Sequence, residues 1–501
     1  MTVTLDPKVS DTTRKFLSSP KKMLIDGKWV DAASGKTFPV YDPAVGDVVA
    51  QVAEGDKEDI DRAVKAARKA FEDGPWRRLT PSERGRIVWK VGELITENLA
   101  ELAELESIDN GKPKTVAGVA DVPLAADMFH YMAGWATKLE GNTIPISVPY
   151  APGSRFHAFT LREPVGVIGQ IIPWNFPLLM AAWKLGPALT TGNCVVLKPA
   201  EQTPLTALRL GELLSEAGLP DGVVNIVPGY GETAGAALAA HDGVDKVAFT
   251  GSTEVGKLIL RAAAGNLKKV SLELGGKSPN VVYKDAGDID AAIAGAAGAI
   301  FFNHGQCCCA GSRLFVEQDI YDEVLEGVAA HAKKIKIGSG LDAATGMGPL
   351  VSQEQLDRVT GFLQSGVDEG ARTVCGGGRV GDKGYFVEPT VITKTNPDMK
   401  VVREEIFGPV VVAESFTDPE ELLPIANNTE YGLAAGVWTQ DISKAHRTAE
   451  RLRAGTVWIN CYNVFDAALP FGGYKQSGWG REMGHEVLDL YTQTKAVVIA
   501  V

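Results

Sequence analysis

The sequence predicts an α/β protein in which two parallel sheets follow one another along the chain. Short runs rich in β-branched residues alternate with segments of helical periodicity, and the alternation starts again near Pro279. Such βαβ units form doubly wound sheets, which bind ligands beyond the carboxyl ends of their strands. The strand-like runs cover residues 165–172, 193–197, 223–227, 246–250, 268–274, 280–283 and 313–317. The helix-like segments cover residues 204–217, 233–240, 253–264 and 288–302.

Helices precede these units, and two extended segments lie outside them. Apolar residues recur on one helical face over 59–71, and Pro81 starts a helical stretch through Leu105 that a turn at Asn110-Gly111 ends. Residues 143–152, with three prolines, and residues 487–501 predict extended arms. Arms of this kind often pair between subunits, although an exposed terminal strand fits the pattern too.

Composition and charge exclude several classes of protein. The chain has 501 residues, with 50 basic and 62 acidic side chains and a net charge of −12, which disfavours binding to nucleic acid or to anionic membranes. Its first twenty residues lack the apolar segment of a secretory signal, and six cysteines form no disulfide framework, so we expect a reducing, cytoplasmic compartment. Residues 164–183 carry no charge, but three prolines favour strand, loop and helix over a membrane span.

A glycine-rich loop follows the strand at 246–250. Gly251, Gly256 and Lys257 have the spacing of a phosphate-binding loop, but Leu258 occupies the position where a hydroxyl would bind Mg²⁺. A phosphate-loop nucleotide hydrolase is therefore disfavoured, and the G-x-G-x-x-G fingerprint is absent. A glycine turn at a helix start still suits a phosphate group, although a structural turn capped by Ser252 fits equally well.

Two further positions carry reactive groups. Cys307, Cys308 and Cys309 are adjacent, which is not zinc-ligand spacing, so we expect no metal; one thiol could be a nucleophile or simply buried and inert. Glu273 ends an apolar strand, where burial would raise its pKa, although a strand-end carboxylate often faces solvent. His304 is a rival base, but a histidine on a turn is usually a hydrogen-bonded surface residue.

Seven motifs together resemble the NAD(P)-dependent aldehyde dehydrogenases, in order and in spacing, over nearly the whole chain from about Met23. They are PWNFP at 173–177, KPAEQTP at 198–204, FTGSTEVG at 249–256, LELGGKSPN at 272–280, GQCCCAGSR at 305–313, EEIFGPV at 404–410 and PFGGYKQSG at 470–478. The resemblance implies three parts: a Rossmann-like NAD-binding domain, an α/β catalytic domain, and a small β arm that forms a homo-oligomer, either a dimer or a tetramer. We assign residues 1–142 and 164–275 to the first part, 276–482 to the second, and 143–163 with 483–501 to the third.

The resemblance also assigns catalytic roles. Cys308 matches the nucleophile that forms a thiohemiacetal with the aldehyde and then, after hydride transfer, a thioester. Asn175 matches the side-chain donor that holds the developing oxyanion together with the Cys308 backbone amide. Glu273 matches the base that activates water to release the carboxylic acid. A protein that keeps this fold without the chemistry is disfavoured because all three residues are intact.

The cofactor implied by the resemblance is NAD. Glu201 would accept hydrogen bonds from ribose hydroxyls and repel a 2′-phosphate, which favours NAD over NADP, although Lys198 and Glu201 could also be a solvated ion pair. The matching cofactor positions are Ile171, Pro173, Trp174, Lys198, Glu201, Gly231, Gly251, Ser252, Gly256, Glu405 and Phe407.

The substrate implied is a small aldehyde in a tunnel lined by aromatic rings. The matching positions are Phe176, Trp183, Phe302, Phe465 and Phe471, with Cys307 and Cys309 beside the nucleophile. The rings predict an apolar aldehyde, aromatic or of medium chain length, although several could be ordinary core residues. Betaine aldehyde, held by cation–π contact, and an amino aldehyde, met by Asp466, remain alternatives.

Overall fold

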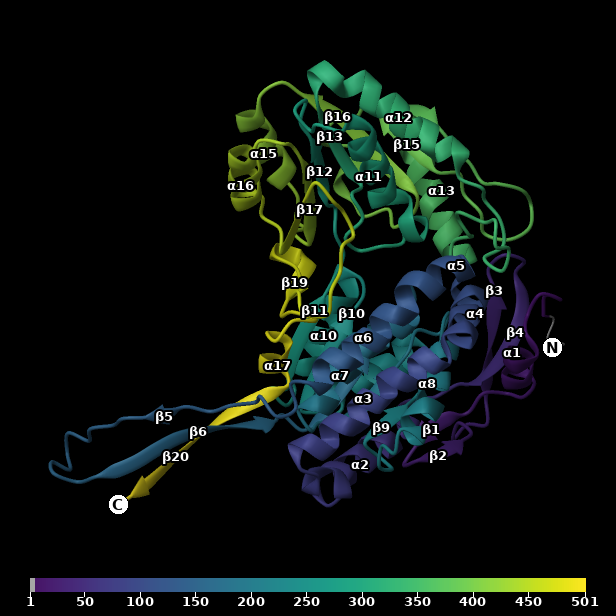
Figure 1. Cartoon of the computed structure of the whole chain (residues 1–501). Coiled ribbons are helices and arrows are strands. Elements are labelled where there is room, and N and C mark those ends of the chain that lie inside the picture. Colours follow the sequence, from purple (N-terminus) through teal and green to yellow (C-terminus); the bar gives the residue numbers. More distant parts are fainter. Residues whose placement is uncertain (1–4) are drawn as a thin grey trace.

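The computed structural model describes residues 5–501 and contains two large sheets, one in each half of the molecule (Figure 1). The first sheet has eight strands, of which five are parallel, and antiparallel strands lie at both of its edges. In spatial order they are β19 (Gly478–Trp479), β11 (Lys269–Glu273), β10 (Lys246–Thr250), β7 (Val167–Ile171), β8 (Cys194–Lys198), β9 (Val224–Ile226), β1 (Met23–Ile25) and β2 (Lys28–Val30). The parallel strands β7, β8 and β9 are buried along their whole length, as the apolar runs predict.

The second sheet has seven strands, and only the pairing of its first two is antiparallel. In spatial order they are β14 (Arg372–Cys375), β15 (Thr390–Thr393), β16 (Val410–Phe416), β13 (Arg313–Glu317), β12 (Pro279–Val282), β17 (Ala434–Trp438) and β18 (Thr456–Ile459). The two sheets confirm the α/β class and the second alternation from Pro279. The seven predicted strands lie within two residues of the observed ones.

Helices cover both sheets (Figure 1). Those of the first half are α1 (Asp11–Leu17), α2 (Lys57–Glu72), α3 (Pro81–Glu97), α4 (Leu99–Asn110), α5 (Lys114–Val116), α6 (Val122–Ala133), α7 (Pro177–Thr190), α8 (Leu205–Glu216), α9 (Ala236–Ala240) and α10 (Thr253–Ala263). Those that follow are α11 (Ile289–Phe301), α12 (Tyr321–Lys334), α13 (Gln353–Asp368), α14 (Lys400–Arg403), α15 (Pro419–Asn427), α16 (Ile442–Arg451) and α17 (Val487–Leu490). Single π-helical turns precede α6 and α9, at Ala117–Asp121 and Gly231–Gly235.

One predicted helix is in fact two. The stretch from Pro81 through Leu105 breaks at Asn98, which leaves the helical region with φ −104° and ψ 20°. Its side-chain amide donates to the carbonyl of Leu94 at 2.8 Å, so it satisfies a carbonyl at the end of α3. The chain then starts α4 in a new direction.

The two predicted extended segments form an arm that projects from the body of the molecule (Figure 1). The arm is a three-stranded sheet in which β20 (Thr492–Ala500) pairs antiparallel with β6 (Phe156–Pro164), and β6 pairs with β5 (Thr143–Ile144). The prediction for 487–501 is wrong at its start, where α17 forms. A separate hairpin joins β3 (Thr37–Asp42) and β4 (Asp47–Ala53).

The uncharged segment 164–183 folds as β7, a turn and the first half of α7, as its prolines predict. Every residue of α7 is buried. Within residues 5–501, no helix combines the length and the apolar character needed to cross a bilayer. The turn after β7 therefore carries Trp174 and Asn175 to the carboxyl edge of the first sheet, where the ends of β8, β10 and β11 also lie.

Candidate active site

A cavity of about 1010 Å³ lies where the carboxyl ends of the first sheet face loops of the second half. Most of the residues that the sequence analysis singled out line it. These are Ile171, Pro173, Trp174, Asn175, Phe176, Trp183, Lys198, Glu201, Gly231, Gly251, Ser252, Phe302, Cys307, Cys308, Cys309, Glu405, Phe407, Phe465 and Phe471. Glu273 and Gly256 are not part of the lining. The volume is large enough for a dinucleotide and a small aldehyde together.

A sharp turn between α11 and the cysteines brings Cys308 to the cavity. Asn303, His304 and Gly305 all have positive φ, at 49°, 59° and 68°. A Cβ atom on Gly305 would collide with the carbonyl oxygen of Gly408, so glycine is the residue that fits at this position. A left-handed conformation is costly at Asn303 and His304, which are not glycine, and residues so strained are found mainly at functional sites.

The three thiols lie close together but differ in exposure. Cys307 and Cys309 are buried, with their sulfur atoms 3.3 Å apart, whereas Cys308 is partly exposed. The hydroxyl of Tyr462 donates to the carbonyl of Cys309 at 2.8 Å. Hydrogen bonding to the Cys307 thiol, together with burial, raises the pKa of Cys308 well above its usual range. The raised pKa favours the protonated form of the Cys308 thiol.

Asn175 is held in the turn between β7 and α7. Its side-chain amide donates to the carbonyl of Gln306 at 3.1 Å, two residues before Cys308. Its own carbonyl accepts from the amide of Asn303 at 3.0 Å, and the side chain of Asn110 donates to the carbonyl of Trp174 at 2.8 Å. The loop that carries Asn175 is thus tied to the cysteine turn on one side and to α4 on the other.

Glu273 is buried at the end of β11, with 5% of its surface exposed, so it does not face solvent. Burial first, and the charge of Glu482 second, raise its pKa well above the usual range, against the opposing charges of Lys184 and Arg481. Its Oε2 atom has no hydrogen-bond partner among residues 5–501. The carboxyl group lies against the backbone of Gly472, next to Phe471 of the cavity lining. The Glu273 carboxyl therefore lies just outside the cavity lining, beside the residue that follows Phe471.

His304 is not the surface residue that the sequence suggested. It is fully buried, and its Nε2 accepts a hydrogen bond from the amide of Gly348 at 3.0 Å. Burial, with the charge of Lys112 second, lowers the pKa of His304 to about 3. The ring is therefore neutral and anchors the turn rather than acting as a base in the cavity.

The glycine-rich loop caps a helix and also reaches the cavity. Ser252 caps α10 by accepting from the amide of Val255 at 3.2 Å, and Gly251 and Ser252 line the cavity. Gly256 is not part of the cavity lining, and a Cβ atom there would meet the Leu274 side chain at 2.8 Å. Its role visible in the structure is close packing between helix and strand.

Charged residues on both sides of the cavity are oriented by specific bonds. Lys198 is buried and pairs with Glu201 at 2.8 Å, so the two are not a freely solvated pair. Glu405 accepts from the backbone amide of Gly276 at 3.0 Å, and burial raises the pKa of Glu405 to about 7. The Phe407 ring packs edge-on against Trp174 with centroids 5.2 Å apart.

Aromatic rings form one end of the cavity. Phe471 lies 5.4 Å from Trp183 and 5.6 Å from Phe465, centroid to centroid, and Phe176 lies 6.1 Å from Phe302. Asp466, which could have met an amino group, is exposed; it caps its own turn through the amide of Ala468 and is not part of the cavity lining. The rings present an apolar surface without that carboxylate.

Sequence reasoning missed the buried charges behind the site. Lys184 and Glu482 form a buried ion pair, and Lys112 pairs with Glu106 and Asp121. A single lysine within the apolar run of α7 was a signal for the first pair. Among residues 5–501, no group of three or more His, Cys, Asp or Glu side chains is arranged to hold a metal ion.

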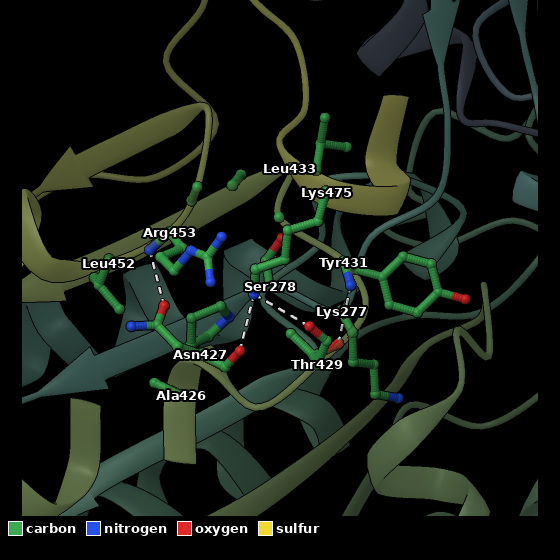
Figure 2. A pocket seen from close by; sticks show the side chains of 14 residues that line it. Lys277, Ser278, Ala426, Asn427, Thr429, Tyr431, Leu433, Leu452, Arg453 and Lys475 are labelled. Atoms are coloured by element: carbon green, nitrogen blue, oxygen red, sulfur yellow. Dashed lines mark hydrogen bonds between the residues drawn. The ribbon is translucent and has the colours of Figure 1, made fainter. Parts of the chain in front are cut away.

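A second pocket, shown in Figure 2, is far smaller, at about 10 Å³. Lys475 reaches across it and donates to the carbonyls of Asn427 at 2.8 Å and Thr429 at 3.1 Å. The volume admits at most one water molecule, and the ammonium group is already bonded. The bonds from Lys475 hold the turn at residues 427–429 in place, and the pocket is too small for a substrate.

Comparison with known proteins gives one consistent result. The model of the family described as "Aldehyde dehydrogenase family" matches residues 29–497. The mitochondrial aldehyde dehydrogenase of Homo sapiens is 54% identical over 482 residues, covering 96% of this chain and 92% of that protein. The mitochondrial benzaldehyde dehydrogenase of Antirrhinum majus is 53% identical over 480 residues, covering 96% and 89%. The solved structure of the NAD+ complex of aldehyde dehydrogenase from Bacillus cereus covers 100% of both chains, at 52% identity and a TM-score of 0.96.

The strained turn before Cys308 yields a prediction for stability. Changing Gly305→Ala should lower the free energy of unfolding by about 1–3 kcal/mol, because the new Cβ atom meets the Gly408 carbonyl and disfavours a φ of 68°. Gly361→Ala is the matched control, since a Cβ atom on Gly361 in α13 has open space and should stabilise the helix slightly. Chemical denaturation measures both changes. Equal stability of the two variants would show that the turn is not strained.

Proposed function

The chain belongs to the aldehyde dehydrogenase family, and we propose that it oxidises an apolar aldehyde, aromatic or of medium chain length, to the carboxylic acid with NAD. Family membership confirms the resemblance seen in the sequence. The observation that carries the proposal is a single cavity shared by a strained cysteine turn, a glycine-rich loop and a cluster of aromatic rings. Bound NAD supplies the hydride acceptor.

The residues along the cavity fit such a cofactor. Gly251 and Ser252, at the start of α10, present the close backbone approach that a pyrophosphate requires. Glu201, paired with Lys198 on one side, offers its carboxylate to ribose hydroxyls and repels a 2′-phosphate, which supports NAD over NADP. The remaining proposed contacts are Ile171, Pro173, Trp174, Gly231, Gly256, Glu405 and Phe407, with Gly256 contributing through the packing of α10.

The proposed chemistry starts at Cys308. Its sulfur atom attacks the aldehyde carbon, the thiol proton passes to water in the cavity, and the carbonyl oxygen becomes an alkoxide held by the Asn175 amide and the Cys308 backbone amide. Loss of hydride from this thiohemiacetal leaves a thioester. Glu273, as the carboxylate, then takes a proton from water; the water attacks the thioester, the carbon–sulfur bond breaks, and the acid is released.

The substrate class is argued from the aromatic rings. Five aromatic rings line the cavity that also contains Cys307, Cys308 and Cys309, and we expect the aldehyde to bind among them. The rings favour an aromatic or medium-chain aldehyde. They are Phe176, Trp183, Phe302, Phe465 and Phe471. The relative named benzaldehyde dehydrogenase supports this class. Cation–π contact with betaine aldehyde is the alternative that the rings also permit.

We further propose a cytoplasmic homo-oligomer, a dimer or a tetramer, in which the arm meets a second subunit. The strands of the arm expose three large apolar side chains, which a second subunit would cover on assembly. They are Leu161, Val498 and Ile499. In this proposal residues 1–142 and 164–275 bind the cofactor, 276–482 carry Cys308, and 143–163 with 483–501 mediate assembly. The short strand β19 joins the cofactor sheet from within the 276–482 segment.

Replacing the nucleophile tests the reaction itself. Cys308→Ala should reduce NADH formation by roughly a thousandfold or more, because no thiohemiacetal can form, while NAD binding is retained. Cys375→Ala is the control, since Cys375 is buried in β14 and takes no part in the cavity. Absorbance of NADH and fluorescence titration of NAD measure the two quantities. Normal turnover by the Cys308→Ala variant would contradict the proposed role of Cys308 as the nucleophile.

The role of Glu273 predicts a pH dependence. Only the ionised carboxyl accepts a proton, and its pKa is raised, so the steady rate should climb with pH up to that raised pKa and level off above it. Glu273→Gln should give one rapid burst of NADH per active site and then a steady rate reduced about 100-fold or more, without this rise. Stopped-flow traces at several pH values measure both phases. A wild-type steady rate in Glu273→Gln would remove Glu273 from hydrolysis.

The rings predict which aldehyde reacts best. In a panel of benzaldehyde, hexanal, an amino aldehyde and betaine aldehyde, we expect kcat/KM to be highest for benzaldehyde or hexanal. Phe465→Ala should lower kcat/KM for benzaldehyde about tenfold and leave acetaldehyde little changed, because only the larger substrate reaches the ring. NADH absorbance measures every rate. If betaine aldehyde were the preferred substrate, the proposed apolar substrate class would be wrong, and recognition by cation–π contact would be favoured instead.

A further inference from the structure

Lys112 is a buried charge that the proposed chemistry does not use. It follows α4 and has no exposed surface. Its ammonium group lies 3.3 Å from the Glu106 carboxyl and forms an ion pair with Asp121, which lines the cavity at the end of the π-helical turn Ala117–Asp121. Burying a lysine is unfavourable unless it is paired and bonded, so Lys112 needs both a carboxylate partner and hydrogen-bond acceptors around it.

The same ammonium group also contacts the loop that carries Asn175. It donates to the main-chain carbonyl of Asn175 at 3.2 Å and lies 4.3 Å from the centre of the Phe176 ring. The carbonyl of Asn175 has a second donor in the amide of Asn303 at 3.0 Å. Lys112 therefore fixes the backbone from which the Asn175 amide projects, and it touches the first ring of the substrate path.

The cluster around Lys112 is balanced in charge and joined to α7. Burial first, and then the neighbouring Asp121, raise the pKa of Glu106 to about 8, so Glu106 is mainly protonated at neutral pH. The pair of Lys112 and Asp121 is then electrically neutral. Glu106 also accepts from the backbone amide of Leu178 at 2.7 Å, in the first turn of α7. The cluster thus joins α4, the π-helical turn and the start of α7.

We propose that Lys112 is a positioning residue for aldehyde oxidation, which holds the Asn175 amide in line with the developing alkoxide and the Phe176 ring against the substrate path. A charged donor suits this task because its bond to the Asn175 carbonyl lies in a dry interior, where it is stronger than a neutral bond. The inference rests on the proposed role of Asn175 as the oxyanion donor. A displacement of about 1 Å at such a donor can cost on the order of a hundredfold in rate.

The test removes the bond while keeping the interior neutral. Lys112→Met combined with Asp121→Asn eliminates the ammonium group without leaving a buried carboxylate, and Asp121→Asn alone gives the reference. Lys112→Gln with Asp121→Asn is a second neutral pair, one bond shorter than lysine, in case the first does not fold. The control is Lys114→Met, because Lys114 lies two residues away, pairs with Glu104 and does not line the cavity. Stopped-flow NADH formation, NAD binding and thermal unfolding are measured for each.

Relative to Asp121→Asn, we expect either double variant to lower the first-turnover rate about tenfold to a hundredfold. NAD affinity and the rate of Lys114→Met should stay at wild-type values. In an Asn175→Ala background, the double change should lower the rate by a much smaller factor, because the donor that Lys112 positions is already gone and only its contact with Phe176 remains to be lost. A merely structural role for Lys112 would lower the rate by the same factor in both backgrounds.

The outcomes separate this inference from the function on which it rests. If Asn175→Ala itself leaves the first turnover unchanged, the proposed oxyanion donor fails, and the role of Lys112 fails with it. If Asn175→Ala slows turnover but the neutral double variants do not, only the inference about Lys112 is overturned. Equal losses in the two backgrounds, or a loss of NAD affinity that accounts for the slower rate, also overturn it.

Discussion

The site depends on bonds that join the carboxyl end of the first sheet to the segments that precede the strands of the second sheet. Ser477 is the centre of this junction: its carbonyl accepts from the amide of Leu274 at 3.0 Å, and its hydroxyl donates to Gly275 at 2.6 Å and accepts from Gly432 at 3.0 Å. The Glu405 carboxyl adds a bond to Gly276. Since reacting groups must be placed to within about 0.5 Å, bonds across the junction set the geometry that neither sheet could set alone.

Buried ion pairs lie around the site, and among residues 5–501 the Glu273 carboxyl forms no ion pair of its own. Lys184 with Glu482, and Lys112 with Asp121, form ion pairs beside the cavity. Glu273 lies near the first pair but keeps one oxygen atom without a hydrogen bond among residues 5–501. Burial beside the charge of Glu482 raises the pKa of Glu273 and favours its protonated form. This environment is what the proposed base requires, and it follows from pairing elsewhere in the interior.

Local patterns in the sequence predicted the sheets well and the support of the site poorly. Apolar, β-branched runs located seven strands, and the apolar neighbours of Glu273 correctly suggested its burial. The break at Asn98 was missed because helical periodicity continues on both sides of it. The burial of His304 was missed because its partner, Gly348, lies 44 residues away. The same limit applies to Lys112, whose bond to Asn175 spans 63 residues and leaves no periodic signal.

Backbone strain at the site is held by side chains that reach in from neighbouring elements. Asn303 and His304 belong to types that tolerate positive φ, but Phe407, with φ 61°, does not. Its carbonyl accepts from Gln355 of α13 at 2.6 Å, and its ring packs against Trp174. Phe407 is thus fixed by a bond from α13, whereas Asn303 and His304 are bonded to the turns that carry Asn175 and Gly348. Two loops constrained in this way keep their shape in the free protein, so the cavity is largely formed before any ligand arrives.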